Sequence, residues 1–328
     1  MNRLAVSFLS LLTLAPALLA QGTEHDLGTQ VKAGTTVWFA EHANNESTID
    51  MAGQEMTTAQ KLTRNFRITV KELTADGNHV VEVEVARIYG TFDVPMLGEM
   101  KIDSAGGAEG DDDEGGFGME QLDELKTKLT EMANRKYLAR VGRDGKVVGA
   151  VRELGKDGKE DEGEDEGGVK QLVESAFGLR PKTKIAEGGT WDFDQDQSSG
   201  QMPMKAKAKA KLVKVSDDLF ETSVEGALEK NAGAKLGDGA EDDEEAAMQA
   251  EMLEGMTIEN GKMTGKQQLS RKDGLLMDSN TTMAADIAME TPIGSMSMKV
   301  KTVTTIKRIT EAEARPAKKE EKKEDGDK

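Results

Sequence analysis

The feature that most constrains this chain is a long alternation of side chains between Leu275 and Ile309, near its C-terminal end. A period of two residues is typical of a strand with one buried side and one solvent-facing side. The turn residues Thr291 to Ser295 divide the alternation into two runs. The first run has apolar or small residues at Leu275, Met277, Ser279, Thr281, Met283, Ala285, Ile287 and Met289. The stretch therefore predicts a long antiparallel hairpin.

The first strand of this hairpin is longer than the usual range of about 3–10 residues. A strand of this length should be bent or bulged somewhere along its course. We therefore expect a bend or bulge near Ser279–Thr281 or Ala284–Asp286.

Tight-turn dipeptides predict further hairpins along the chain. They are Asp76-Gly77, Asp144-Gly145, Asn260-Gly261 and Asp273-Gly274. The segment from Gly255 to Met263 superficially resembles a phosphate-binding loop, but its spacing is one residue too long and Met263 replaces the required Ser or Thr. We interpret this segment as a hairpin.

Two stretches change to the period of a helix. Between Met119 and Met132 the apolar positions, which include Leu122, Leu125 and Leu129, recur every three or four residues. A shorter stretch from Val169 to Phe177 has the same pattern and is followed by Gly178, a residue that commonly ends helices. The sequence thus predicts short amphipathic helices among many strands.

The chain also contains an internal repeat. Each of its two Trp residues follows a Gly-Thr turn that enters a strand, and Pro95–Ile102 resembles Pro292–Val300. We expect two related halves, about 22–104 and 186–309. The predicted fold is mainly β, a β-rich α+β class. It is a curved antiparallel sheet or half-barrel of these halves, with two or three short amphipathic helices on its concave side.

The N-terminal residues are typical of a secretory signal. Arg3 precedes an apolar run that is too short to span a bilayer, and the small residue Ala20 suits a cleavage site. The short apolar run disfavours the alternative, a membrane anchor. The chain has no Cys, so it has neither a lipid-modified cysteine nor a disulfide framework. We expect residues 1–20 to be a signal peptide, the protein to be exported to the periplasm or beyond the cell, and the mature chain to lack a transmembrane segment.

The charge of the chain is strongly negative, with a formal value of −18. This charge argues against nucleic acid as a partner, because nucleic-acid binding needs basic patches. Much of the acid lies in Gly-rich tracts at 105–116, 155–168 and 233–245, whose composition predicts mobile insertions. Weak cation binding by these tracts is the alternative. The charged tail 311–328 is expected to be disordered, and residues 21–310 to form one β-rich domain.

Catalytic and metal-binding patterns are absent from the sequence. The three His residues are scattered, and no nucleophile motif or zinc helix can be assembled. We expect no catalytic residue, no metal site and no cofactor, and hence not an enzyme. Two Met-x-Met pairs, Met202/Met204 and Met296/Met298, suggest soft Cu(I) ligands, but core packing explains them better because no His or Cys lies nearby in the sequence.

Methionine is unusually abundant, at 18 residues. Its flexible side chain suits a lining for a lipid or another apolar small molecule, although ordinary core packing is the simpler interpretation. The candidate lining consists of Met277, Met283, Ile287 and Met289 on the long strand, with Leu122, Leu125 and Leu129 of the helix as the opposite wall. A carrier of a hydrophobic ligand and a structural or protein-interaction module of the cell envelope both remain open. The oligomeric state is not predicted.

Several short motifs together resemble a family of uncharacterised exported bacterial proteins, known as a domain of unknown function. The motifs are the signal peptide, the strand starts Gly34–Trp38 and Gly188–Trp191, the turn Arg143–Val147 and the Met-Pro-Met run at Met202. The resemblance covers most of residues 30–309 and implies no activity and no site residues. The expected architecture is also distantly similar to the half-barrels of periplasmic lipoprotein carriers, a likeness that does not transfer function.

Overall fold

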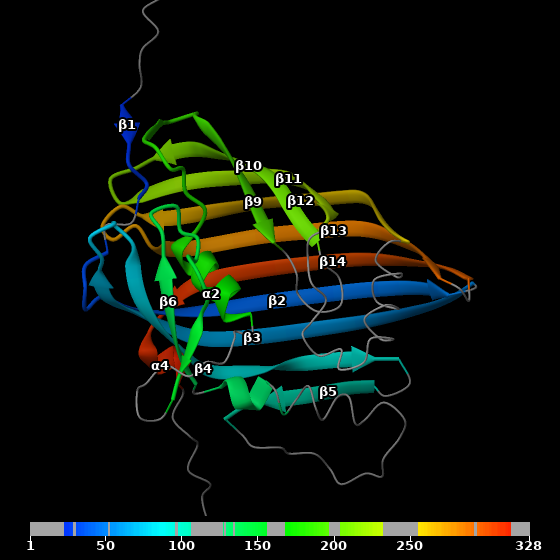
Figure 1. Cartoon of the computed structure of the whole chain (residues 1–328). Coiled ribbons are helices and arrows are strands. Elements are labelled where there is room, and N and C mark those ends of the chain that lie inside the picture. Colours follow the sequence, from blue (N-terminus) through cyan, green and yellow to red (C-terminus); the bar gives the residue numbers. More distant parts are fainter. Residues whose placement is uncertain are drawn as a thin grey trace, which may run out of the picture.

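The fold is a single curved antiparallel sheet, seen in a computed structural model (Figure 1). The structure describes residues 23–28, 31–51, 53–95, 98–105, 127, 129–133, 135–155, 168–196, 204–231, 255–291 and 294–315. Among these residues, twelve strands form the main sheet, whose two ends do not pair with each other. The expected β-rich class and curved, open sheet are therefore confirmed.

The elements appear along the chain in the following order. They are β1 (Glu24–His25), β2 (Thr36–Met51), β3 (Gln54–Leu73), β4 (His79–Val94), β5 (Gly98–Asp103), β6 (Lys136–Val141), β7 (Arg152–Leu154), α2 (Val169–Phe177), β8 (Ile185–Ala186), β9 (Thr190–Asp196), β10 (Met204–Val215), β11 (Leu219–Lys230), β12 (Met256–Ser270), β13 (Leu276–Thr291), β14 (Gly294–Ile309) and α4 (Glu311–Ala314). The small strands β1 and β8 pair separately from the main sheet.

The main sheet runs β7-β6-β4-β3-β2-β14-β13-β12-β11-β10-β9, and β5 pairs beside β4. The strands of the two expected halves thus lie on opposite sides of one seam, where β2 pairs with β14. The long hairpin from Leu275 is confirmed as β13 and β14, which pair from Asp278 and Lys307 to Thr291 and Gly294. The turns at Asp76-Gly77, Asp144-Gly145 and Asp273-Gly274 are also present.

The expected hairpin at Asn260-Gly261 is wrong. Both residues lie inside the single strand β12, where they form a bulge opposite Ala285 of β13. Asn260 has φ 51°, a left-handed value that Asn tolerates better than most residues, so the dipeptide bends a strand instead of reversing it. A second bulge lies at the start of β13, where Met277 is the extra residue between the pairs Leu269–Leu276 and Gln268–Asp278. The bulge expected near Ala284–Asp286 is therefore present, although its extra residues belong to the partner strand β12. The alternative position, Ser279–Thr281, has no bulge.

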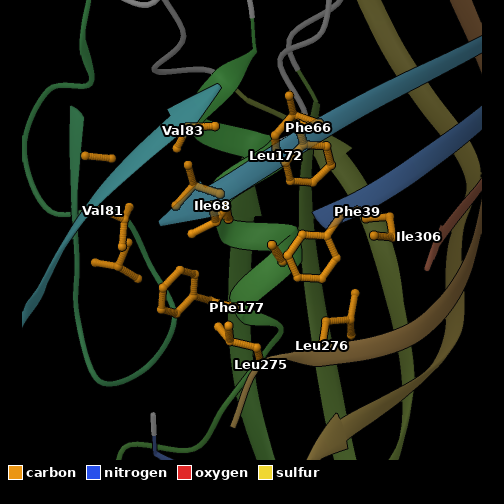
Figure 2. Close-up of a cluster of buried hydrophobic side chains, with 14 of the residues drawn as sticks. Phe39, Phe66, Ile68, Val81, Val83, Leu172, Phe177, Leu275, Leu276 and Ile306 are labelled. Carbon is orange, nitrogen blue, oxygen red and sulfur yellow. The ribbon is translucent and has the colours of Figure 1, made fainter. Parts of the chain in front are cut away.

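A hydrophobic cluster lies around α2, on the concave side of the sheet (Figure 2). Phe39 of β2 and Phe66 of β3 stack across the strands with ring centroids 5.4 Å apart. Leu172 and Phe177 of α2 lie among these rings and Leu275 (Figure 2). Burial of these large side chains is the main source of stability at this end. We call this set, with its Phe, Val, Leu and Ile neighbours, the aromatic cluster.

The helix α2 follows the sequence prediction closely. Its buried residues lie on one face, and it ends at Gly178, which has φ 70° and whose N–H bonds back to the helix. It packs on the concave side of the sheet, as expected for the amphipathic helices (Figure 1). Residues 129–132 are also helical, and they form the described end of the helix predicted between Met119 and Met132.

The C-terminal helix α4 lies on the opposite, outer face. Neighbouring residues of a strand point to opposite faces, so Trp38 faces outward where Phe39 faces inward. The guanidinium group of Arg315 lies 5.2 Å from the centre of the Trp38 ring, and the Asn65 side chain donates a hydrogen bond to the Ala314 carbonyl oxygen. A capping box at Thr310 begins the helix. The expected disorder of the tail is therefore wrong for residues 311–315.

Several expectations fall outside the described residues. These are the signal peptide 1–20, nearly all of the three acidic tracts and the tail beyond residue 315. In the part of the chain that is described, no helix has both the length and the apolar character needed to cross a membrane.

Candidate functional site

The other end of the concave side carries a second buried cluster, which we call the methionine face. Its buried members come from β9 to β14 and are mostly Met and Ala. They are Phe193, Ala206, Ala208, Ala210, Val224, Leu228, Met256, Met263, Ala285, Ile287, Met289 and Met298. Met204, Met283 and Met296 pack against them as half-buried residues. The alternating inward positions of six neighbouring strands thus form one continuous apolar surface.

The two clusters differ in stiffness because they differ in side-chain type. The aromatic cluster has Met132 as its one buried Met, and it is built from Phe and branched aliphatic residues with few rotamers. The methionine face has four buried Met residues and four buried Ala residues. Methionine has three rotatable bonds and tolerates several packings. The methionine face can therefore change shape at a smaller cost than the aromatic cluster.

A belt of buried polar residues separates the two clusters. On β11, Thr222 lies between Val224 and Phe220, which belong to different clusters. Gln267 of β12 and Ser279 of β13 occupy the equivalent places on their strands. The Gln267 side-chain oxygen accepts a hydrogen bond of 3.2 Å from the Leu179 backbone N–H, which fixes the segment after α2 to the sheet.

The predicted lining residues divide among several places. Ile287 and Met289 are buried within the methionine face, and Met283 packs against it. Met277 is half-buried at the bulge and does not join that cluster. Leu129 packs against the aromatic cluster, so the structure does not bring it opposite Met283. Leu122 and Leu125 lie outside the described residues.

A cleft of about 490 Å³ opens beside the methionine face. Its walls are the β6–β7 turn, the segment after α2 and strand β9. The lining residues are Asp144, Lys146, Leu179, Arg180, Pro181, Lys182, Trp191, Asp192, Phe193 and Asp194. Leu179, Trp191 and Phe193 also belong to or pack against the methionine face. The cleft and the methionine face therefore share a wall.

The cleft lies where the two ends of the sheet approach each other. Lys146 Nζ, on the β6–β7 turn, donates a hydrogen bond of 2.8 Å to the backbone oxygen of Asp194 on β9. This contact joins the β6–β7 turn to a strand with which β6 and β7 do not pair. The cleft is consequently bounded by two elements that can separate without breaking a strand ladder.

Arg180 is the most deeply buried charge of the cleft, with 4% of its surface exposed. Its guanidinium group donates to the backbone oxygens of Phe177 and Gly274 and lies 5.7 Å from the centre of the Phe177 ring. Burial lowers the pKa of Arg180 to about 9, while nearby carboxylates, led by Asp273, oppose this shift. The side chain is therefore held in place by the end of α2 and remains positively charged at neutral pH.

The two outward acids of the cleft are paired on the outer face. Asp192 and Asp194 alternate with the inward Trp191 and Phe193 on β9. Lys205 Nζ lies 2.9 Å from an Asp194 carboxylate oxygen, and its hydrogen bond lowers the pKa of Asp194. Lys209 lies 3.7 Å from Asp192. These pairs explain the strict Lys alternation of β10: the lysines pair with acids across strands, and their faces are solvated, as the sequence suggested.

Outside the cleft, the potential metal-ligating side chains of the described residues are scattered. Across the described ranges, no three His, Asp or Glu side chains come together so that they could hold a metal ion. His79 is buried beside the Phe177 ring, at 6.2 Å between ring centroids, and belongs to the packing of α2.

The sequence reasoning missed the cleft residues. The Gly188–Trp191 motif predicts only the start of a strand, because nothing in the sequence of β9 indicates which element lies across the cleft from it. Arg180 and Lys182 follow the helix that ends at Gly178, and neither belongs to a strand alternation or to a helical period. A signal was nevertheless present: an Arg-Pro-Lys run directly after an amphipathic helix places cations at a helix end, where they are favourable.

Comparison with known protein families gives a match for part of the chain. Residues 163–276 match a family model described as a family of unknown function (DUF6263). No curated protein sequence matches the chain. The resemblance to an uncharacterised family is thereby confirmed for the segment that contains α2, Arg180 and strands β8 to β12.

Three solved structures are similar at low scores. One, titled for lipid–protein interactions in lipovitellin, has a TM-score of 0.45 and 7% identity, and covers 86% of this chain and 26% of that one. An outer membrane channel from Pseudomonas putida F1 has a TM-score of 0.27 and 7% sequence identity, and the match covers 86% of this chain and 97% of that one. A DUF1329 family protein from Desulfovibrio piger has a TM-score of 0.14 and 7% sequence identity, and the match covers 84% of this chain and 90% of that one. The chain spans about a quarter of the length of the lipovitellin chain. Residues 163–276 are thus similar to a family whose function is unknown.

Proposed function

We propose that this protein is a non-catalytic carrier or sensor of an apolar ligand, which lies against the methionine face. The N-terminal pattern of residues 1–20 supports a role outside the cytoplasm, in the periplasm or beyond the cell. The observation that carries the proposal is the contrast between the two clusters of one sheet. The aromatic cluster contains the large, stiff side chains of the core, whereas the second cluster of flexible Met and small Ala residues adds little rigidity.

The position of the cleft supports the same function. Binding sites are commonly concave, largely apolar and supplied with a few polar groups. The cleft is richer in charge than such sites, because six of its ten lining residues are charged, but it reaches the apolar methionine face through Leu179, Trp191 and Phe193. A ligand entering at the cleft would meet apolar side chains that can rearrange around it.

The test uses Met283, which lies on β13 opposite Met263 and is half-buried against the methionine face. In Met283→Glu, a carboxylate would be desolvated by a bound apolar ligand, so we expect binding of a fluorescent apolar dye to weaken at least about tenfold. Dye titration of the folded variant measures this effect. Native mass spectrometry of gently purified wild-type protein should also detect a retained lipid.

A matched control keeps the loss of binding apart from the loss of stability. Val213 of β10 is 46% exposed, so Val213→Glu adds the same charge to the same sheet without touching the methionine face. Urea unfolding of both variants shows whether they are folded at the dye-binding temperature. If the folded wild type binds no dye and retains no lipid, the carrier function is wrong, and a structural or protein-interaction role in the cell envelope takes its place.

A further inference from the structure

We infer that the ligand is a single-chain amphiphile with an anionic head group, such as a long-chain fatty acid. Its carboxylate would lie in the cleft near Arg180 and Lys182, and its chain would run along the methionine face. This inference rests on the proposed function and specifies the chemical class of the ligand. It follows from the way in which one cleft combines cations with an apolar wall.

The charges inside the cleft are unequal. Lys146, Arg180 and Lys182 line it, and Asp144 is the one lining acid whose carboxylate is not engaged by the lysines of β10. Lys146 Nζ donates to a neutral backbone oxygen. Lys182 is exposed and forms no ion pair with any described residue. Asp192 and Asp194 are paired with lysines on the outer face, and Arg180 already lies near Asp273, Asp144 and Asp26. The positive charge left for an anionic ligand therefore comes from Lys146 and Lys182, at the mouth of the buried Arg180.

The apolar wall begins directly beside these cations. Leu179 precedes Arg180 in the chain, and its N–H is fixed to Gln267 of the polar belt. Trp191 and Phe193 stand on the opposite side, on β9, and both contact the methionine face. An anionic head group held by the cations would therefore place its chain on the apolar surface without crossing a polar region.

Trp191 provides a further indication. Its Nε1 atom is buried and has no hydrogen-bond partner among the described residues. A buried N–H group without an acceptor is unfavourable, and most such groups in proteins are paired. A carboxylate oxygen that reached this atom after a small rotation of the ring would supply the missing acceptor.

The experiment uses Trp191 as the reporter. The only other Trp, Trp38, lies on the outer face between Arg67 and Arg315, so Trp38→Phe leaves one Trp, at the cleft. Bromine-labelled stearic acid and the matching brominated stearyl alcohol quench Trp fluorescence on contact. We expect the acid to quench Trp191 at a concentration about tenfold lower than the alcohol, because only the acid carries a charge.

Charge reversal then tests the position of the head group. In the Trp38→Phe background, Lys182→Glu should weaken binding of the acid about tenfold and leave binding of the alcohol unchanged. Lys184→Glu is the matched control: the same charge change is made two residues away, at an exposed lysine that does not line the cleft. Circular dichroism melting of each variant confirms that it is folded.

The outcomes separate the two claims. Preferential binding of the acid, lost in Lys182→Glu and kept in Lys184→Glu, supports the inference. If acid and alcohol bind equally, or if both charge reversals weaken the acid equally, the head-group site is overturned while the carrier function stands. If neither compound quenches Trp191 and no apolar dye binds, the proposed function itself fails.

Discussion

The two buried clusters should respond differently when a large side chain is truncated. Leu172 of α2 is fully buried in the aromatic cluster, against rings that belong to two neighbouring strands (Figure 2). Those strands are fixed by the sheet, so the space left by Leu172→Ala stays open. Substitutions of this kind cost about 2.7–5.0 kcal/mol, increasing with the residual cavity. We expect a loss near the middle of that range, about 4 kcal/mol.

Met289 of β13 offers the comparison. It is 7% exposed and pairs in register with Met256 on one side and Met296 on the other. Either neighbour can turn its flexible side chain into the space that Met289→Ala leaves. We therefore expect a loss at the low end of the range for buried Met, about 2 kcal/mol.

Equilibrium unfolding in urea, followed by far-ultraviolet circular dichroism, measures both losses. The conservative variants Leu172→Met and Met289→Leu serve as controls, since swaps of similar volume usually cost less than about 1.5 kcal/mol. The slope of the transition must agree among the variants, so that midpoints can be compared. Equal losses for the two Ala variants, within about 0.5 kcal/mol, would refute the reasoning, because the methionine face would then be as rigid as the aromatic cluster.

Two other predictions concern the packing around α2. Burial lowers the pKa of His79 below 6.5, so the folded state binds fewer protons than the unfolded chain and stability falls as the pH drops below this value. His79→Leu should flatten the dependence of the urea midpoint between about pH 7 and pH 5, whereas the same change at the exposed His42 should not; an unchanged slope in His79→Leu would contradict this. Gly145→Ala should lower stability by more than about 2 kcal/mol, because φ is +83° and a Cβ atom would lie 2.4 Å from a carbonyl oxygen at the end of α2. Gly149→Ala has a similar φ and open space, so its thermal melting should show a smaller loss of about 1 kcal/mol, and equal losses would exclude the contact as the cause.

The sheet could be predicted from sequence because its signals are local. The alternation in β13 and β14, the Lys-Ala alternation of β10 and the Asp-Gly turns each depend on a few neighbouring residues. Asn260-Gly261 shows the limit: the same dipeptide serves a turn or a bulge, and the choice depends on the strand that lies opposite. The sequence also did not show which residues at the start of β13 point inward. The bulge at Met277 shifts the alternation, so that Leu276 is inward at an even position and Ser279 at an odd one.

The candidate site could be predicted only in part. Ile287, Met289 and Met283 were placed on one face correctly, since period two determines which residues share a face. The opposite wall depends on how the whole sheet curves, and no local pattern contains that information. For this reason the prediction that Leu129 lies opposite Met283 fails, since Leu129 packs against the aromatic cluster, and the sequence did not predict Arg180 and Trp191 at the site.

The seam between β2 and β14 has a consequence for the order of folding. Trp38 pairs with Ile309 across it, so two of the central strands of the sheet come from opposite ends of the chain. During synthesis, β2 emerges early and keeps one unpaired edge until β14, the last strand, is complete. Pairings between such distant segments form slowly. The sheet is therefore completed only after β14 has been synthesised, and any truncation before β14 leaves the 16-residue edge of β2 open to pairing with another chain.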